Sequence, residues 1–189
     1  RTAQLPPGWE ATSVKSAIVF VDECGSHLAL TREYARSPRG DRAVGSVPRN
    51  RGANVSLIAA LSAGEFGAEF AVEGAVDGEV FEVWVEQILL PWLRPGQTVI
   101  WDNLRVHYRC RAQQLIEQAG CRVIFLPAYS PDFSPIEQAF SKLKAHLKAA
   151  AARTIPALLD AIAAAIRTIS PHDISGWFNH CGYPVAHSL

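Results

Sequence analysis

Residues 126–137 read Leu-Pro-Ala-Tyr-Ser-Pro-Asp-Phe-Ser-Pro-Ile-Glu, and this stretch separates an apolar strand from a helix. Its three prolines interrupt regular structure, because proline has no amide donor and restricts the residue before it. Ser134 is a favourable N-cap, Pro135 suits the first helical position and Glu137 falls at the third, which predicts a capping box. The stretch therefore predicts a helix that begins at Pro135 and carries a carboxylate in its first turn.

This helix is expected to have two distinct faces. Apolar residues at helical spacing predict a stripe that faces the core; they are Ile136, Phe140, Leu143 and Leu147. A polar set has the same spacing one residue later, about 100° round the helix; its members are Glu137, Ser141, Lys144 and Lys148. The carboxylate and the two lysines should therefore share one face at the edge of the core.

Two further acidic residues follow short apolar runs. Asp22 ends the run 17–21, and Asp102 ends the run 99–101. Continuous apolar runs of this kind predict buried strands, and functional groups of open α/β sheets gather at the carboxyl ends of strands. We expect Asp22, Asp102 and Glu137 to converge on a divalent metal. Hard oxygen ligands suit Mg²⁺ or Mn²⁺, and such a cluster supports phosphodiester chemistry without a covalent intermediate.

The order of elements predicts the fold class. Early strands have short connections and should be antiparallel, whereas later ones are joined by helical crossovers and should be parallel. Strands are expected at 17–22, 28–34, 54–61, 68–72, 98–102 and 122–126, and helices at 78–93, 108–119, from 135, 155–169 and 171–179. The prediction is a mixed α/β sheet with helices on both faces. We expect a lead-in at 1–15, a catalytic core at 16–152 and C-terminal helices at 153–189 that pack on the same domain.

Composition indicates a globular protein and excludes several classes. The chain has 189 residues, of which 49% are hydrophobic and 19% charged, which suits one domain with a sizeable core. We expect no membrane span and no secretory signal, because the apolar runs are too short. The four cysteines form no C-x-x-C pair, so reduced cytosolic thiols are the expected state and a zinc ribbon is disfavoured; they are Cys24, Cys110, Cys121 and Cys181.

The formal net charge is zero, but charges are unevenly distributed. Residues 32–51 contain six arginines and two acids, whereas residues 65–86 contain seven acids and no base. Further basic residues follow Asp102 and Glu137 closely in the sequence; they are Arg105, Arg109, Arg111, Lys142, Lys144, Lys148 and Arg153. Basic residues beside carboxylates suit a polyanion brought to a metal site. Ordinary solvated faces remain the alternative for each single cluster.

Three segments of the chain together resemble a known family. Val21-Asp22-Glu23, then Trp101-Asp102-Asn103 with His107, then residues 126–137 look like the three signatures of a DDE transposase. The resemblance is to the bacterial insertion-sequence relatives of the mariner group. In that group the second and third acids are separated as Asp102 and Glu137 are here, by 34 residues (103–136). The closing segment 177–183 resembles the end of such proteins, so the likeness covers nearly the whole chain.

The resemblance implies a ribonuclease-H-like fold and a cut-and-paste nuclease and strand-transfer activity in the bacterial cytoplasm. It implies double-stranded DNA, at element ends and targets, as the partner, and a homodimer as the active form. Family members usually carry an N-terminal helix-turn-helix half, for which this chain has no room. Our hypothesis for the cofactor is two Mg²⁺ (or Mn²⁺) ions bridged by Asp22, with Asp102 and Glu137 each holding one.

The candidate site has local alternatives. Asp22 and Asp102 could be turn residues, Glu137 could be only the capping partner of Ser134, and Glu23 should point to the opposite side of its strand. Candidate DNA contacts are Asn103, His107, Arg39, Arg105, Lys144 and Lys148. Two other functions stay open. One is a different ribonuclease-H-like nuclease such as a resolvase, and the other is a non-catalytic remnant that binds DNA or a partner.

Overall fold

The computed structural model describes residues 17–101, 110–126 and 131–183. Its elements in chain order are β1 (Ile18–His27), β2 (Asn54–Ser62), β3 (Phe66–Glu73), α1 (Gly78–Trp84), η1 (Val85–Leu89), α2 (Leu90–Trp92), β4 (Thr98–Trp101), α3 (Cys110–Gln118), β5 (Arg122–Phe125), η3 (Pro131–Phe133), α4 (Pro135–Ala150), α5 (Ile155–Ile166) and α6 (Pro171–His180).

The strands form one mixed sheet with the order β3-β2-β1-β4-β5. β1 pairs antiparallel with β2, and β2 pairs antiparallel with β3. β1 pairs parallel with β4, and β4 pairs parallel with β5. A short turn joins the antiparallel β2 and β3, whereas the longer segment 28–53 joins β1 and β2; helices precede β4 and β5, the strands that pair in parallel. The predicted mixed sheet, antiparallel first and parallel later, is confirmed.

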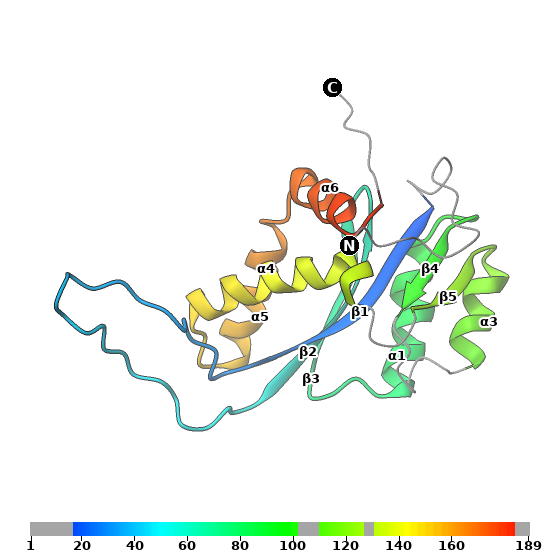
Figure 1. Ribbon diagram of the computed structural model, residues 1–189. Coiled ribbons are helices and arrows are strands. Elements are labelled where there is room, and N and C mark those ends of the chain that lie inside the picture. The colour runs from blue at the N-terminus through cyan, green and yellow to red at the C-terminus, as the bar shows by residue number, and fades with distance from the viewer. Residues whose placement is uncertain (1–16, 102–109, 127–130, 184–189) are drawn as a thin grey trace.

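Helices cover both faces of the sheet, as predicted (Figure 1). Neighbouring residues of β1 point to opposite faces and enter different cores: Phe20 belongs to the core under α4, α5 and α6, whereas Val21 belongs to the core under α1, η1 and α3. Both side chains are nearly inaccessible to solvent. The central strands are therefore apolar on both faces, which explains their continuous apolar runs in the sequence.

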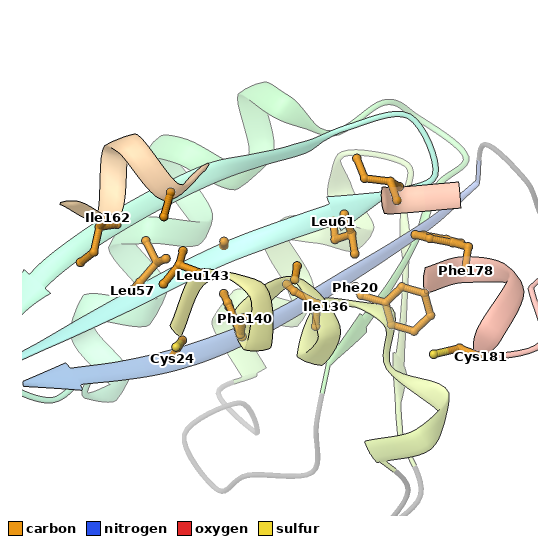
Figure 2. Close-up of a cluster of buried hydrophobic side chains, with 14 of the residues drawn as sticks. Phe20, Cys24, Leu57, Leu61, Ile136, Phe140, Leu143, Ile162, Phe178 and Cys181 are labelled. Carbon is orange, nitrogen blue, oxygen red and sulfur yellow. The ribbon is translucent and has the colours of Figure 1, made fainter. Parts of the chain in front are cut away.

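The predicted apolar stripe of α4 is buried in full. Its members are Ile136, Phe140, Leu143 and Leu147, each 3% exposed or less. Figure 2 shows the first three pointing from α4 toward the sheet, where Phe20 and Cys24 of β1 lie. The stripe orients α4 on the sheet, and so determines where the polar face that carries Glu137 lies.

Two strand predictions need correction. β1 continues past Asp22 to His27, because β2 pairs with it as far as the register His27↔Asn54. Asp22 therefore lies inside β1 and does not end it. The strand expected at 28–34 is absent, and that part of the described chain has no regular structure. The amide of Leu30 donates to the carbonyl of His27 in a turn that ends the strand.

The helix predicted at 78–93 is present but contains a π-helical segment, η1. The cause lies in Pro91, which has no N–H and whose ring would meet the carbonyl of Gln87 in a regular α-helix. Widening the helix by one residue avoids this conflict, and the amide of Leu90 donates to the carbonyl of Val85, five residues back.

One ion pair fixes α6 to α4. Nζ of Lys142 on α4 donates to Oδ2 of Asp173 at 2.6 Å and to the carbonyl of Thr168 at 2.8 Å. Asp173 also closes a capping box with Ser170 at the start of α6. The hydrogen bond from Lys142, together with those from Ser170, holds the pKa of Asp173 well below its usual range.

We expect Lys142→Ala to lower the free energy of unfolding by about 1–2 kcal/mol near neutral pH, the usual size for a charge-assisted hydrogen bond. A depressed carboxylate pKa stabilises the fold above the pKa of the unfolded chain, about 3.9, and the stabilisation is lost as the pH falls toward the folded value. The difference between parent and variant should therefore shrink at about pH 3. Urea unfolding followed by circular dichroism measures both.

The double variant Lys142→Ala/Asp173→Asn is the control, because it has no carboxylate left to titrate at this position. Its stability should depend less steeply on pH than that of the parent. A loss in Lys142→Ala that is the same size at both pH values would contradict the assignment.

Candidate functional site

Asp22 lies on β1, one residue after Val21, which pairs with Trp101 of β4. On its other side, β1 pairs with β2 through Asp22↔Ala59. Asp22 is half-buried, and its Oδ1 accepts a hydrogen bond of 2.8 Å from the amide of Glu23. Asp102 comes next after Trp101 in the sequence and lies outside the described residues.

The alternation of β1 decides which face each acid uses. Asp22 stands between Phe20 and Cys24, which both belong to the core covered by α4. Glu23 follows the alternation of Val19 and Val21 and belongs to the opposite face. The prediction that Glu23 points away from Asp22 agrees with this arrangement.

Glu137 lies in the first turn of α4 and is exposed. The predicted capping box is wrong: Ser134 is the N-cap residue, but its side chain makes no cap hydrogen bond. The amide of Glu137 instead donates to the backbone carbonyl of Ser134 at 3.2 Å. Helix capping therefore does not account for a glutamate at this position, which was the main alternative to a role in the site.

The thiol of Cys24 shows that the groups on β1 and α4 converge. Burial raises the pKa of Cys24, the charge and hydrogen bond of Lys144 lower it, and the carboxylates of Asp22 and Glu137 raise it. Asp22, Glu137 and Lys144 thus each lie near enough to Cys24 to affect its thiol. Two of the three predicted acids and one predicted cation therefore surround this residue of β1.

Sequence reasoning did not select Cys24. Two spacings could have identified it: Cys24 is two residues after Asp22, on the same face of a strand, and Lys144 is seven after Glu137, on the same face of a helix. The sequence alone does not show that this face of β1 packs against this face of α4.

The other candidate DNA contacts are not part of this cluster in the described residues. The ammonium of Lys148 forms an ion pair with Glu33. Arg39 lies in the exposed segment between β1 and β2. Asn103, Arg105 and His107 lie outside the described residues.

The donor set fits a hard divalent cation. Asp22 and Glu137 supply carboxylate oxygens, the ligands that Mg²⁺ and Mn²⁺ prefer. Within residues 17–101, 110–126 and 131–183 there is no group of three or more histidine, cysteine or acidic side chains that could hold a metal ion. The third predicted ligand, Asp102, falls in the gap between the first two ranges, so the described part of the chain contains two of the three acids.

The described helices include none that is both long and apolar enough to cross a lipid bilayer.

The fold matches that of solved transposase structures. The chain superposes on structures of the Mos1 transposase with 92% of its length: on a pre-cleavage transpososome with a TM-score of 0.70 and 17% identity, and on the catalytic domain with a TM-score of 0.63 and 13% identity. A Mos1 paired-end complex with Mg matches 88% of this chain, with a TM-score of 0.67 and 17% identity. The five-stranded mixed sheet is thus the ribonuclease-H-like fold of those catalytic domains.

The sequence places the chain in a family. The profile described as "DDE superfamily endonuclease" matches residues 17–159, and the chain belongs to this family of nuclease-type enzymes. The chain covers 54% of the Mos1 chain in the transpososome and 79% of the isolated Mos1 catalytic domain, so it spans about half the length of the complete transposase. None of the curated proteins matches it.

The absence of a side-chain cap hydrogen bond from Ser134 can be tested by comparison with Ser170, which does cap its helix. Ser134→Ala should change the free energy of unfolding by less than about 0.5 kcal/mol, because no cap hydrogen bond is lost. Ser170→Ala, which breaks the capping box of α6, should lower it by about 1–2 kcal/mol. Urea unfolding of the two variants measures both, and a similar cost at the two serines would show that Ser134 does cap α4.

Proposed function

We propose that this chain is the catalytic part of a DNA transposase that cleaves DNA strands and transfers them at the ends of an insertion element. The observation that carries the proposal is the meeting of Asp22, Glu137 and Lys144 around Cys24, within the fold of a DDE endonuclease. The proposed catalytic residues are Asp22, Asp102 and Glu137. Residues 16–152 would form the catalytic core, with the helices of residues 153–189 packed on it.

The three acids would hold two Mg²⁺ or Mn²⁺ ions, with Asp22 shared between them. Solved Mos1 paired-end complexes with Mg and with Mn support this choice of metal. Such a pair, when bound, supplies activation of water or a DNA 3′-OH and stabilisation of the leaving oxygen. The half-buried Asp22 is suited to a fixed position, whereas the exposed Glu137 remains accessible to a polyanionic substrate.

Basic residues near the acids would bring the phosphate backbone to the site. Lys144 offers an exposed ammonium beside the carboxylates, and the arginines of the segment between β1 and β2 offer further positive charge. We propose Asn103, Arg105 and His107 as additional contacts on the strength of their nearness to Asp102 in the sequence. Lys148 is a weaker candidate for a DNA contact, because its ammonium already pairs with Glu33.

The partners are proposals of the same kind. Mos1 structures include a paired-end complex with a left transposon end, which supports DNA of element ends as the partner here. A homodimer is proposed as the active form because transposition joins two ends. Recognition of the element ends would reside in a helix-turn-helix half outside this chain. A different ribonuclease-H-like nuclease and a non-catalytic remnant are the competing functions.

The decisive experiment is cleavage of an end-labelled DNA duplex with Mg²⁺ or Mn²⁺. We expect Glu137→Ala and Asp102→Asn each to lower the nicking rate by at least about 100-fold, because each removes a ligand from a metal site worth several kcal/mol in the transition state. The matched control is Glu73→Ala, an exposed glutamate at the end of β3, which should leave the rate unchanged.

The outcomes separate the alternatives. Nicking by the parent that survives in Asp102→Asn or Glu137→Ala would refute the assignment of the triad. If the parent does not nick the duplex, the assay should be repeated with the helix-turn-helix half of a related transposase added. Continued inactivity would favour a non-catalytic remnant. Products joined to a second duplex would distinguish strand transfer from simple hydrolysis, and so a transposase from a resolvase-like nuclease.

A further inference from the structure

The segment between β1 and β2, residues 28–53, forms an arm that reaches well beyond the sheet and helices (Figure 1). Residues 32–47 of the arm are all exposed, including apolar side chains: Tyr34 is 88% exposed and Val44 is 91% exposed. The same stretch carries six arginines. An arm with so few contacts of its own is oriented only by the contacts at its base, where it leaves β1 and returns to β2.

At the base, a single guanidinium from another part of the chain bridges the backbone. Nη1 of Arg153 lies 2.9 Å from the carbonyl oxygen of Leu28 and 3.0 Å from that of Leu30, and it also contacts the carbonyl of Ala152 at 3.1 Å. Leu28 and Leu30 are partly buried against the core that α4 covers. The first turn of the arm is thus held in two ways. Its backbone carbonyls accept from Arg153, and its leucine side chains pack on the core.

The chain makes a strained turn to place this arginine. Ala151 ends α4 in the left-handed conformation, with φ of 49° and ψ of 43°, which costs a non-glycine residue roughly 1 kcal/mol. Its amide donates to the carbonyl of Leu147. A strained alanine persists where the surroundings require it, and here it turns the chain so that Arg153 faces the end of β1.

Two further contacts close the base. Lys148 on α4 pairs with Glu33 of the arm. On the return side, a Cβ built on Gly52 would lie 3.2 Å from Cβ of Leu28, so the two sides of the arm approach closely there. The ion pair joins side chains that are 34% and 60% exposed, and such pairs contribute about 0–1 kcal/mol. Arg153, with its hydrogen bonds to two carbonyls, therefore makes the main polar contact at the base of the arm.

We propose that Arg153 is a positioning residue that fixes the direction in which the arm leaves the catalytic core, with the Lys148–Glu33 pair as its support. Both contacts arise from α4 and the turn after it, and α4 also carries Glu137. The orientation of the arm's arginines relative to α4 is thereby set. Use of that orientation to hold DNA rests on the proposed function, whereas the fixing itself does not.

The test measures the arm directly and needs neither DNA nor metal. Spin labels are placed at Tyr34→Cys, next to the base, and at Val83→Cys on α1, which is 59% exposed, in a Cys110→Ser background. The native Cys24, Cys121 and Cys181 are buried. Pulsed electron paramagnetic resonance then gives the distribution of distances between the two labels.

We expect Arg153→Ala to broaden this distribution about twofold, because the released segment samples more backbone conformations. Arg153→Lys should restore part of the order, since one ammonium reaches fewer of the carbonyls. Arg167→Ala, which removes another exposed arginine at the C-terminal end of α5, should leave the width as in the parent. Exchanging the charges in Glu33→Lys/Lys148→Glu should also preserve it.

An unchanged width in an Arg153→Ala protein that still melts cooperatively would overturn the proposal. If Arg153→Ala does not fold, Arg153→Gln supplies the comparison, because it removes the charge while keeping an amide donor. Equal broadening in Arg167→Ala would also refute the proposal, since it would show a general loosening of the fold. Broadening in Arg153→Ala, together with a parent that cleaves no DNA, would support the role of Arg153 and refute the proposed function alone.

Discussion

The packing of α4 against β1 is the contact on which the candidate site depends. The four large apolar side chains of the α4 stripe, Ile136, Phe140, Leu143 and Leu147, are buried against the sheet, and each contributes about 2 kcal/mol relative to exposure. Together they supply on the order of 8 kcal/mol, which is comparable to the whole net stability of a typical domain. α4 therefore cannot leave the sheet without unfolding the protein, and the position of Glu137 is as secure as the fold.

One helix thus serves three regions of the molecule. Its first turn carries Glu137, its middle carries Lys144 beside Cys24 of β1, and its last turns hold the arm through Lys148 and, beyond the helix, Arg153. On its remaining side Lys142 reaches Asp173 and fixes α6. Because these groups share one rigid element, a displacement of α4 at any of them would be transmitted to the candidate site.

The sheet holds Asp22 through the pairing of β1 with β2. The register of these strands runs without a shift from Val19↔Ser62 to His27↔Asn54 and includes Asp22↔Ala59. Just before Asp22, β1 also pairs with β4 through Val21↔Trp101. The backbone that carries this half-buried carboxylate is therefore fixed by the sheet.

The sequence by itself determined the periodic features. The alternation of β1, the apolar runs of the central strands and the stripe of α4 are local patterns, and local spacing dictates which residues share a face. It also marked Asp22, which follows an apolar run, and Glu137, which lies just after the helix start at Pro135. Asp102 was marked in the same way and remains a prediction.

Only the tertiary structure decided how far β1 extends, since its second half exists through pairing with β2, which the local sequence does not encode. It likewise decided that Ser134 does not cap α4 through its side chain, and that Lys148 and Arg153 bind the arm. These outcomes depend on partners as many as 125 residues away in the chain, and such long-range contacts are set by how faces are brought together and not by spacing along the sequence.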